Sequence, residues 1–225
     1  MSGFVLVSAK GAPGVTTVAA AVAAVAAADG PSLLAELDPS GGSLQVAGVE
    51  PLQSGLVEAA GALRRDPRQV DAVLSNVVDL PPGVSSLVAP TMGQSAESVI
   101  RSVGPRWMPV LGASAPVVMV DGGRWAPTQG SAARVNGAGL VVLVCSPTLH
   151  GVEHTRHLVQ PLREVSRQQV ALVVVGQRPY EPDEVARHLC VPLAGVVAWD
   201  PGGADMLWAS GCSRRWLRTR LGRSA

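Results

Sequence analysis

The sequence predicts an α/β protein of three layers, in which helices cover both faces of a mostly parallel sheet of about seven strands. Short apolar runs rich in valine and leucine recur along the chain, and they are continuous rather than alternating, as in strands buried on both faces. Helical stretches separate these runs, which is typical of right-handed crossovers between parallel strands. The 225 residues are 47% hydrophobic and 16% charged, so the chain can bury a sizeable core.

The expected elements follow from these runs in chain order. Strands are expected at 4–9, 32–37, 85–90, 116–121, 140–145, 171–176 and 193–199. Helices are expected at 16–28, 56–65, 68–77, 94–103, 150–166 and 181–189, and in pieces over 203–221. The segments DPSGG at 38–42 and PPGV at 81–84 favour loops. We find no linker between two cores and no fixed repeat, so residues 1–225 are expected to form a single domain.

Composition excludes several classes of protein. A net charge of +1 predicts no strong general attraction to nucleic acid, and the scarcity of aromatic residues leaves no stacking platform, so no sequence-specific nucleic-acid partner is expected. Cys145, Cys190 and Cys212 lie far apart without a CxxC spacing, which argues against a disulfide framework and a zinc site. The longest apolar run, at 18–28, is too short and too rich in alanine to cross a bilayer. We therefore expect a cytoplasmic protein.

The segment SAKGAPGVTT, residues 8–17, joins the first expected strand to the first expected helix and contains the only lysine of the chain, Lys10. Gly11 and Gly14 allow positive φ, and the free N–H groups at the start of the helix favour an anion. Thr16 stands where a phosphate-binding loop places the hydroxyl that ligates Mg²⁺. A glycine-rich turn that only connects strand and helix is the alternative.

Residues 9–17 resemble the deviant phosphate loop of the ParA/MinD family of ATPases, in which a signature lysine precedes the glycines and a second lysine precedes the Ser/Thr. The residues that match are Lys10, Gly11, Gly14, Thr16 and Thr17. Ala12 replaces a glycine, and Val15 stands where the second lysine belongs. The resemblance implies a nucleotide site formed by Lys10, Gly11, Ala12, Pro13, Gly14, Val15, Thr16 and Thr17, together with Asp121.

Three later segments extend the resemblance over nearly the whole chain. ELDPSGG at 36–42 resembles the second motif of the family, with Glu36 in place of the usual first aspartate and with Asp38 as the second. VVMVDGG at 117–123 resembles the Walker B strand, with Asp121 matched and Gly122 where a threonine is common. The last two strands and their Pro/Asp turn suggest base-side residues, which are Gln177, Arg178, Asp200 and Pro201.

The resemblance carries further expectations for fold and cofactors. It implies a P-loop NTPase-like arrangement of the three layers, with ATP and Mg²⁺ as cofactors. It also implies that Glu36 and Asp38 are the catalytic carboxylates, of which Glu36 would position an attacking water. The Mg²⁺ ligands, where a nucleotide binds, would be Thr16, Asp38 and Asp121.

The valine at position 15 decides the functional expectation. The second lysine of such loops neutralises charge on the transferred phosphoryl group, which valine cannot do. Because a hydrogen bond to a charged group contributes roughly 1.5–3 kcal/mol, its loss predicts binding weaker by about ten- to a hundred-fold and a larger loss in the transition state. We expect a positioning or scaffolding protein with weak or absent ATP hydrolysis, acting in cell division, chromosome partitioning, or pilus or secretion assembly.

The same resemblance predicts a homodimer, in which Lys10 reaches the nucleotide of the partner, and a protein partner in a larger assembly. Two alternatives stay open. One is a genuine slow ATPase that uses Lys10 and Asp121, and the other is an interaction module that binds no nucleotide.

Two surface features have competing interpretations. His150, His154 and His157 share one face of a predicted helix and suggest a metal site, but the apolar residues of that helix occupy another face, so we expect the histidines to be solvated. Residues 213–223, SRRWLRTRLGR, carry five arginines and suggest a basic helix. We expect Trp216 and Leu221 to pack on the domain, with peripheral membrane contact through this helix as the alternative.

Overall fold

The computed structural model describes residues 2–10, 14–44, 55–66, 68–81, 83–128, 131–166, 169–209 and 215–225. Gly11, Ala12 and Pro13 of the expected phosphate loop lie outside the described residues, as does Cys212. The described chain forms one eight-stranded sheet of order β3-β4-β2-β5-β1-β6-β7-β8. The strands are β1 (Ser2–Ser8), β2 (Ser32–Glu36), β3 (Val78–Asp79), β4 (Ser85–Leu87), β5 (Val117–Arg124), β6 (Leu140–Cys145), β7 (Val170–Val175) and β8 (Leu193–Val197).

The helices connect these strands as the alternation predicts. They are α1 (Val15–Ala26), α2 (Gly55–Arg65), α3 (Asp71–Leu74), α4 (Gly93–Val103), α5 (Trp107–Ser114), α6 (Leu149–Val165), α7 (Pro182–Leu189), α8 (Pro201–Trp208) and α9 (Arg220–Ser224). Short 3₁₀ turns occur as η2 (Gly104–Arg106), η3 (Ser131–Arg134) and η4 (Arg215–Arg218). The expected α/β fold is therefore confirmed, with one strand more than the sequence indicated.

The extra strand is β3, which pairs antiparallel with β4, while the other neighbours in the sheet pair in parallel. Only two residues long, β3 has no apolar run to reveal it. The turn that joins it to β4 was predicted: Leu80 N donates to Val84 O at 3.0 Å and Val84 N donates to Pro81 O at 2.9 Å. The helix expected at 68–77 contracts to the four residues of α3.

Helix α5 was not predicted. Its sequence, WMPVLGAS, contains Pro109, which interrupts a helical pattern when it is met in a sequence. In the structure this proline lies in the first turn of α5, where the N–H that it lacks has no intrahelical acceptor. Trp107 and Leu111 are buried in the core, so tertiary packing stabilises a helix that local propensity does not predict.

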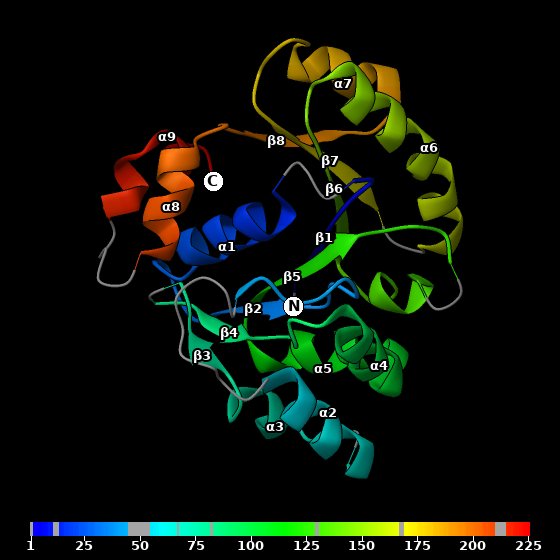
Figure 1. The fold of residues 1–225 in the computed structure, drawn as a ribbon, viewed down its shortest axis with the longest axis vertical. Helices are drawn as coiled ribbons and strands as arrows, with labels where there is room; N and C mark the ends of the chain where they lie inside the picture. The colour runs from blue at the N-terminus through cyan, green and yellow to red at the C-terminus, as the bar shows by residue number, and fades with distance from the viewer. Residues whose placement is uncertain are drawn as a thin grey trace.

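Two hydrophobic cores lie on opposite faces of the sheet (Figure 1). The first lies between the sheet and helices α2 to α7, and the second between the sheet, α1, α8 and the C-terminal elements η4 and α9. In α1 the residues Ala19, Ala20, Ala21 and Ala23 are fully buried. Because alanine side chains are small, they let α1 approach the centre of the sheet closely. The beginning of this helix is thereby held against the carboxyl ends of the strands.

The C-terminal segment packs on the domain in two short pieces. Trp216 and Leu221 belong to the second core, with 5% and 2% of their surface exposed. One Asp200 oxygen accepts a hydrogen bond from Gly203 N at 3.0 Å, and the other accepts one from Leu221 N at 3.1 Å, which ties α9 to the start of α8. Within the described ranges, no helix combines the length and the apolar character needed to cross a bilayer.

Candidate functional site

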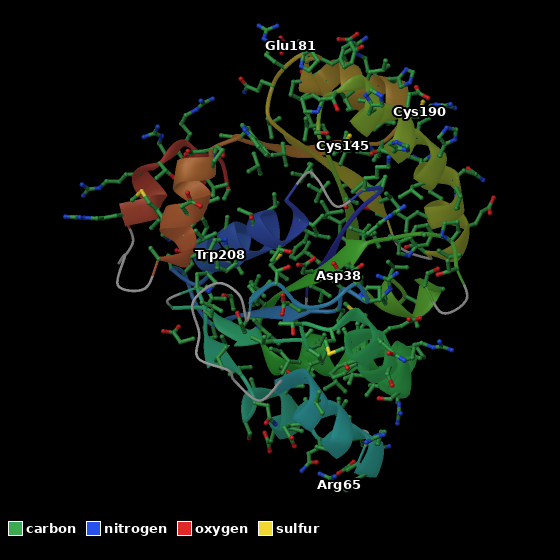
Figure 2. The ribbon with its side chains drawn as sticks, in the orientation of Figure 1. Asp38, Arg65, Cys145, Glu181, Cys190 and Trp208 are labelled. Carbon is green, nitrogen blue, oxygen red and sulfur yellow. The ribbon has the colours of Figure 1, made fainter. Side chains whose placement is uncertain are left out.

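The site predicted from the sequence lies at the carboxyl ends of β1, β2 and β5. These strands are adjacent, and the register aligns Asp121 with both Leu6 of β1 and Glu36 of β2. Parallel strands bring their carboxyl ends to one edge, which is where ligands of open α/β sheets bind. In Figure 2, Asp38 lies near the middle of the molecule, whereas Arg65 and Glu181 lie at its periphery.

The structure brings Thr16 and Asp121 together, as the sequence predicted. Gly14, at φ 74°, precedes α1 in the left-handed conformation that favours glycine. Thr16 Oγ1 then donates to Asp121 Oδ2 at 2.5 Å. The other carboxylate oxygen accepts a hydrogen bond from Gly123 N at 2.9 Å. A hydroxyl and a carboxylate so placed are the pair that holds Mg²⁺ in phosphate-binding loops.

Asp121 is 1% exposed, and its burial raises the pKa of the carboxyl to about 6, with the nearby Asp38 adding to the rise. The hydrogen bonds from Thr16 and Gly123 act in the opposite direction and lower this pKa. A cation between Asp121 and Asp38 would stabilise the ionised form of both carboxylates and would therefore lower the pKa of Asp121. These residues therefore fit Mg²⁺. No three histidine, cysteine or acidic side chains of the described segments gather to hold a metal alone, so phosphate and water would complete the ligand set.

Asp38 is half-buried and rests on the end of β5. Its Oδ1 accepts a hydrogen bond from Ser40 N at 2.8 Å. A Cβ added at Gly123, which has φ 60°, would overlap the Asp38 carboxylate. Gly122 is confined on its other side, since an added Cβ would come within 2.8 Å of Val7 Cγ1. The glycine that replaces the threonine common at this position therefore fits the close approach of β5 to β1.

The carboxylate of Glu36 is buried and accepts three backbone hydrogen bonds. Its Oε1 accepts hydrogen bonds from Ser43 N at 2.7 Å and Leu44 N at 2.9 Å, and its Oε2 accepts one from Ala89 N at 3.0 Å. Burial nevertheless raises the pKa of this carboxyl to about 7, against the effect of these three donors. In this arrangement Glu36 holds the backbone after β2 to the segment after β4. Its positioning of an attacking water stays a prediction.

Sequence reasoning missed Arg134, which lies on η3 behind this edge. It is 7% exposed, and its guanidinium donates to Gly122 O at 2.8 Å and to Arg124 O at 3.4 Å. Burial lowers the pKa of Arg134, while the charges of Asp38 and Glu97 oppose that change. Arg134 thus supports the end of β5 beside Asp38. Its only signal in the sequence is a charge in a short loop.

The base-side residues divide between two adjoining cavities. Asp200 and Pro201 line a cavity of about 310 Å³ that also reaches Gly14 and Thr17 at the start of α1. Gln177 and Arg178 line a neighbouring cavity of about 740 Å³, together with Arg220 and Arg223 of α9. Trp199 lines both cavities and has 60% of its surface exposed. It was not predicted, although an aromatic residue just after a strand is a visible signal.

Lys10 lines a third cavity, which shares Ser146 and Thr148 with the cavity of Gln177 and Arg178. Its side chain is exposed, and this cavity of about 210 Å³ is also lined by His150 and His154 of α6. All three histidines of the predicted helical face are at least partly exposed, as expected. Within the described residues they form no cluster of three that could hold a metal.

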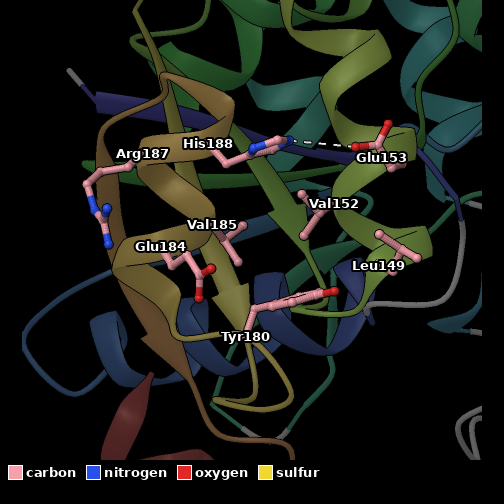
Figure 3. A pocket seen from close by; sticks show the side chains of 8 residues that line it. All are labelled: Leu149, Val152, Glu153, Tyr180, Glu184, Val185, Arg187 and His188. Atoms are coloured by element: carbon pink, nitrogen blue, oxygen red, sulfur yellow. Dashed lines mark ion pairs between the residues drawn. The ribbon is translucent and has the colours of Figure 1, made fainter.

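A further cavity, of about 500 Å³, lies between α6 and α7 (Figure 3). Leu149 and Val152 face Tyr180 and Val185 across it, and an ion pair between Glu153 Oε1 and His188 Nε2, at 3.6 Å, lies at its border. No residue pattern in the sequence predicted a site between these two helices.

Comparison with solved structures shows which known fold the chain shares. The sequence matches no family model and no curated protein. Among solved structures, a ParA family ATPase from Chlorobium tepidum TLS has a TM-score of 0.77 at 16% identity, over 99% of this chain and 95% of that one. The chain has the ParA/MinD fold.

Two MinD structures support the ParA/MinD fold. The septum site-determining protein MinD from Pyrococcus horikoshii OT3, complexed with Mg-ADP, has a TM-score of 0.69 at 16% identity, over 100% of this chain and 93% of that one. The MinC:MinD cell division protein complex from Aquifex aeolicus gives a TM-score of 0.67 at 16% identity, over 92% and 85%. The predicted family resemblance is thus confirmed at the level of structure.

Proposed function

We propose that this chain is a ParA/MinD-like positioning or scaffolding protein that binds ATP with Mg²⁺ and hydrolyses it weakly or not at all. The observation that carries the proposal is Val15. By the family resemblance it stands where the phosphate loop has its second lysine; it is the first residue of α1, is 6% exposed, and packs in the second core. A buried aliphatic side chain supplies no charge to a phosphate, whereas the Thr16 hydroxyl and the Asp121 carboxylate, which we propose for Mg²⁺, are hydrogen-bonded to each other.

The residues around Val15 have separate roles in this proposal. Thr16 and Asp121 would hold Mg²⁺, with Asp38 beside them, and the start of α1 after Gly14 would receive the phosphates. When bound, Mg²⁺ would neutralise negative charge on the phosphates. Lys10, exposed at the edge of the site, would contact the nucleotide of a second copy in a homodimer.

The fold neighbours support the choice of process and partner. MinD is described as septum site-determining and was solved with Mg-ADP, and MinC:MinD is a cell division complex. We extend this to a role in division, chromosome partitioning, or pilus or secretion assembly, in which a protein partner binds the nucleotide-loaded dimer. We place the protein in the cytoplasm, with peripheral membrane contact as the alternative.

A slow ATPase is the second candidate, and the carboxylates favour it. Asp121 and Asp38 lie together beside Thr16, and Glu36 is next to Asp121 in the sheet register. In this version Lys10 supplies the charge that Val15 lacks. Phosphate release that is lost in both Asp121→Asn and Glu36→Gln would support the slow ATPase, and an equal background in both variants would exclude it.

Calorimetric titration with ATP and Mg²⁺ tests nucleotide binding, with Asp121→Asn as the binding-impaired variant. We expect binding by the natural chain, tighter binding by Val15→Lys, and weaker Mg²⁺-dependent binding by Asp121→Asn. A thermal unfolding series provides the second measurement, because a ligand specific for the folded state must raise the melting temperature. A melting temperature indifferent to both ATP and GTP would overturn the proposal in favour of an interaction module without nucleotide.

A further inference from the structure

Two cationic side chains and two histidines gather at the edge of the sheet beside β1 and β6. Lys10 follows β1, and Arg124 ends β5, where the register pairs it with Ser8. His150 and His154 lie one helical turn apart on the first turns of α6. Lys10, His150, His157 and Arg124 all act electrostatically on His154, and we call Lys10, Arg124, His150 and His154 the basic cluster.

Three members of the cluster line a cavity, and Arg124 lies outside its lining. Lys10, His150 and His154 line this space of about 210 Å³, and the side chains of Ser146 and Thr148 line it as well. The two hydroxyls lie 3.3 Å apart. Since one water occupies about 30 Å³ of liquid, the cavity has room for a tetrahedral anion with part of its hydration shell. Cys145, labelled in Figure 2, also lines it.

The charges of the cluster are not compensated within the part of the chain that the structure describes. None of the ion pairs found among the described residues involves Lys10, Arg124, His150 or His154. Glu153, the acid adjacent to His154 on α6, is bonded instead to Arg156 at 3.0 Å.

The electrostatic effect on His154 agrees with this arrangement. Partial burial lowers the pKa of His154, and the positive charges of Lys10, His150, His157 and Arg124 lower it further. The charged groups that lower this pKa are all basic side chains. Cations held together without a counter-charge repel one another, and an anion placed among them would be stabilised and would favour protonated histidine.

We propose that the Lys10, His150 and His154 cavity binds a tetrahedral oxyanion of the phosphate class, beside the Thr16–Asp121 site and separately from it, with proton uptake by His154. The hydroxyls of Ser146 and Thr148 add neutral donors. The anion is either free phosphate or the terminal phosphate of a nucleotide. Binding strengthens as the pH falls through the range in which His154 takes up a proton, because that proton adds a positive charge beside the anion.

Histidine ring resonances in NMR spectra test this proposal directly. Sulfate is the first probe, since its charge does not change between pH 6 and pH 8, and chloride at equal ionic strength controls for screening. We expect sulfate to shift the His150 and His154 signals at pH 6, with affinity at pH 8 lower by about tenfold or more, the scale of one charge-assisted hydrogen bond. Equal shifts by chloride and sulfate would overturn the proposal.

Substitutions give the second readout. His154→Gln and His150→Gln should each weaken sulfate binding by about tenfold, whereas His157→Gln is the matched control, because it lies on the same helical face but outside the cavity. All three side chains are at least partly exposed, so folding should be retained, which dispersed spectra would verify. Equal affinity in His154→Gln and the natural chain would contradict the proposal.

Two further titrations separate the sources of the anion and separate this site from the proposed nucleotide site. Inorganic phosphate should shift the same histidine signals as sulfate, and Asp121→Asn should leave these shifts unchanged even if it loses ATP binding. If ATP with Mg²⁺ shifts the histidines in the natural chain and in Asp121→Asn alike, a nucleotide phosphate also enters the cavity. Histidine signals that respond to ATP but to neither sulfate nor phosphate would refute a separate oxyanion site.

Discussion

Replacing Glu36 by glutamine should remove a specific pH dependence of stability. Burial raises the pKa of Glu36 from 4.5 to about 7, so the folded state favours the protonated carboxyl. This contribution to stability is fully present below about pH 4.5 and is lost as the pH rises through 7. At about 1.4 kcal/mol per pKa unit, a shift of this size corresponds to about 3 kcal/mol of unfolding free energy.

Glutamine also changes the hydrogen bonds, and this effect must be separated from titration. Its carbonyl oxygen can keep the amides of Ser43 and Leu44, which share Oε1, but its NH₂ group would then face the amide of Ala89. We expect this mismatch to cost about 1–3 kcal/mol. Because the mismatch involves no titrating group, it shifts the whole curve by a constant amount.

Urea denaturation between pH 4.5 and pH 8 measures both effects. The natural chain should lose about 3 kcal/mol more than Glu36→Gln over this range, and Glu58→Gln, on the exposed side of α2, controls for the loss of one carboxylate. Parallel pH profiles for the natural chain and Glu36→Gln would refute the assignment of this pH dependence to the buried carboxyl.

Three substitutions test the other structural claims. Val15→Lys should bind ATP with Mg²⁺ at least about tenfold more tightly in calorimetry. Because the buried valine is lost, the variant should also lose about 1.5 kcal/mol or more of unfolding free energy. Unchanged affinity in the folded variant would count against the role given to position 15. Gly123→Ala should lower the free energy of unfolding by about 1–3 kcal/mol because of the positive φ alone, and the added methyl group should also displace Asp38. Unchanged stability together with unchanged Mg²⁺-dependent binding would contradict the close packing of Gly123 against Asp38. In urea denaturation, Trp216→Ala should lose about 3–5 kcal/mol of unfolding free energy. Trp199→Ala, at an exposed position, should change it by no more than about 0.5 kcal/mol. Equal losses in the two variants would argue against the packing of the C-terminal segment.

The sequence predicted the elements that bury long apolar runs and missed those that depend on packing. All five residues of β2 are buried, and the apolar run that such a strand requires can be recognised in the sequence. By contrast, β3 exists because a turn returns two residues along β4, and α5 because Trp107 and Leu111 are buried. In these two cases the stabilising contacts are distant in the chain, so no local pattern records them.

The candidate site divides in a similar way. Thr16 and Asp121, 105 positions apart, were paired correctly because the family resemblance supplied the spatial relation that spacing alone could not. The three amides bound by Glu36 come from backbone groups, which no side-chain pattern encodes. Arg134 is defined by its contact with the Gly122 carbonyl, and the cavity at Lys10 by the approach of α6 to β1. Both need the folded chain to be seen.

A single-turnover experiment with γ-labelled ATP, Mg²⁺ and excess protein tests the central claim most directly, because it reports bound nucleotide and released phosphate in one sample. We predict that the natural chain retains the label as intact ATP and releases phosphate no faster than Asp121→Asn. Rapid release of labelled phosphate by the natural chain, abolished in Asp121→Asn, would contradict the account.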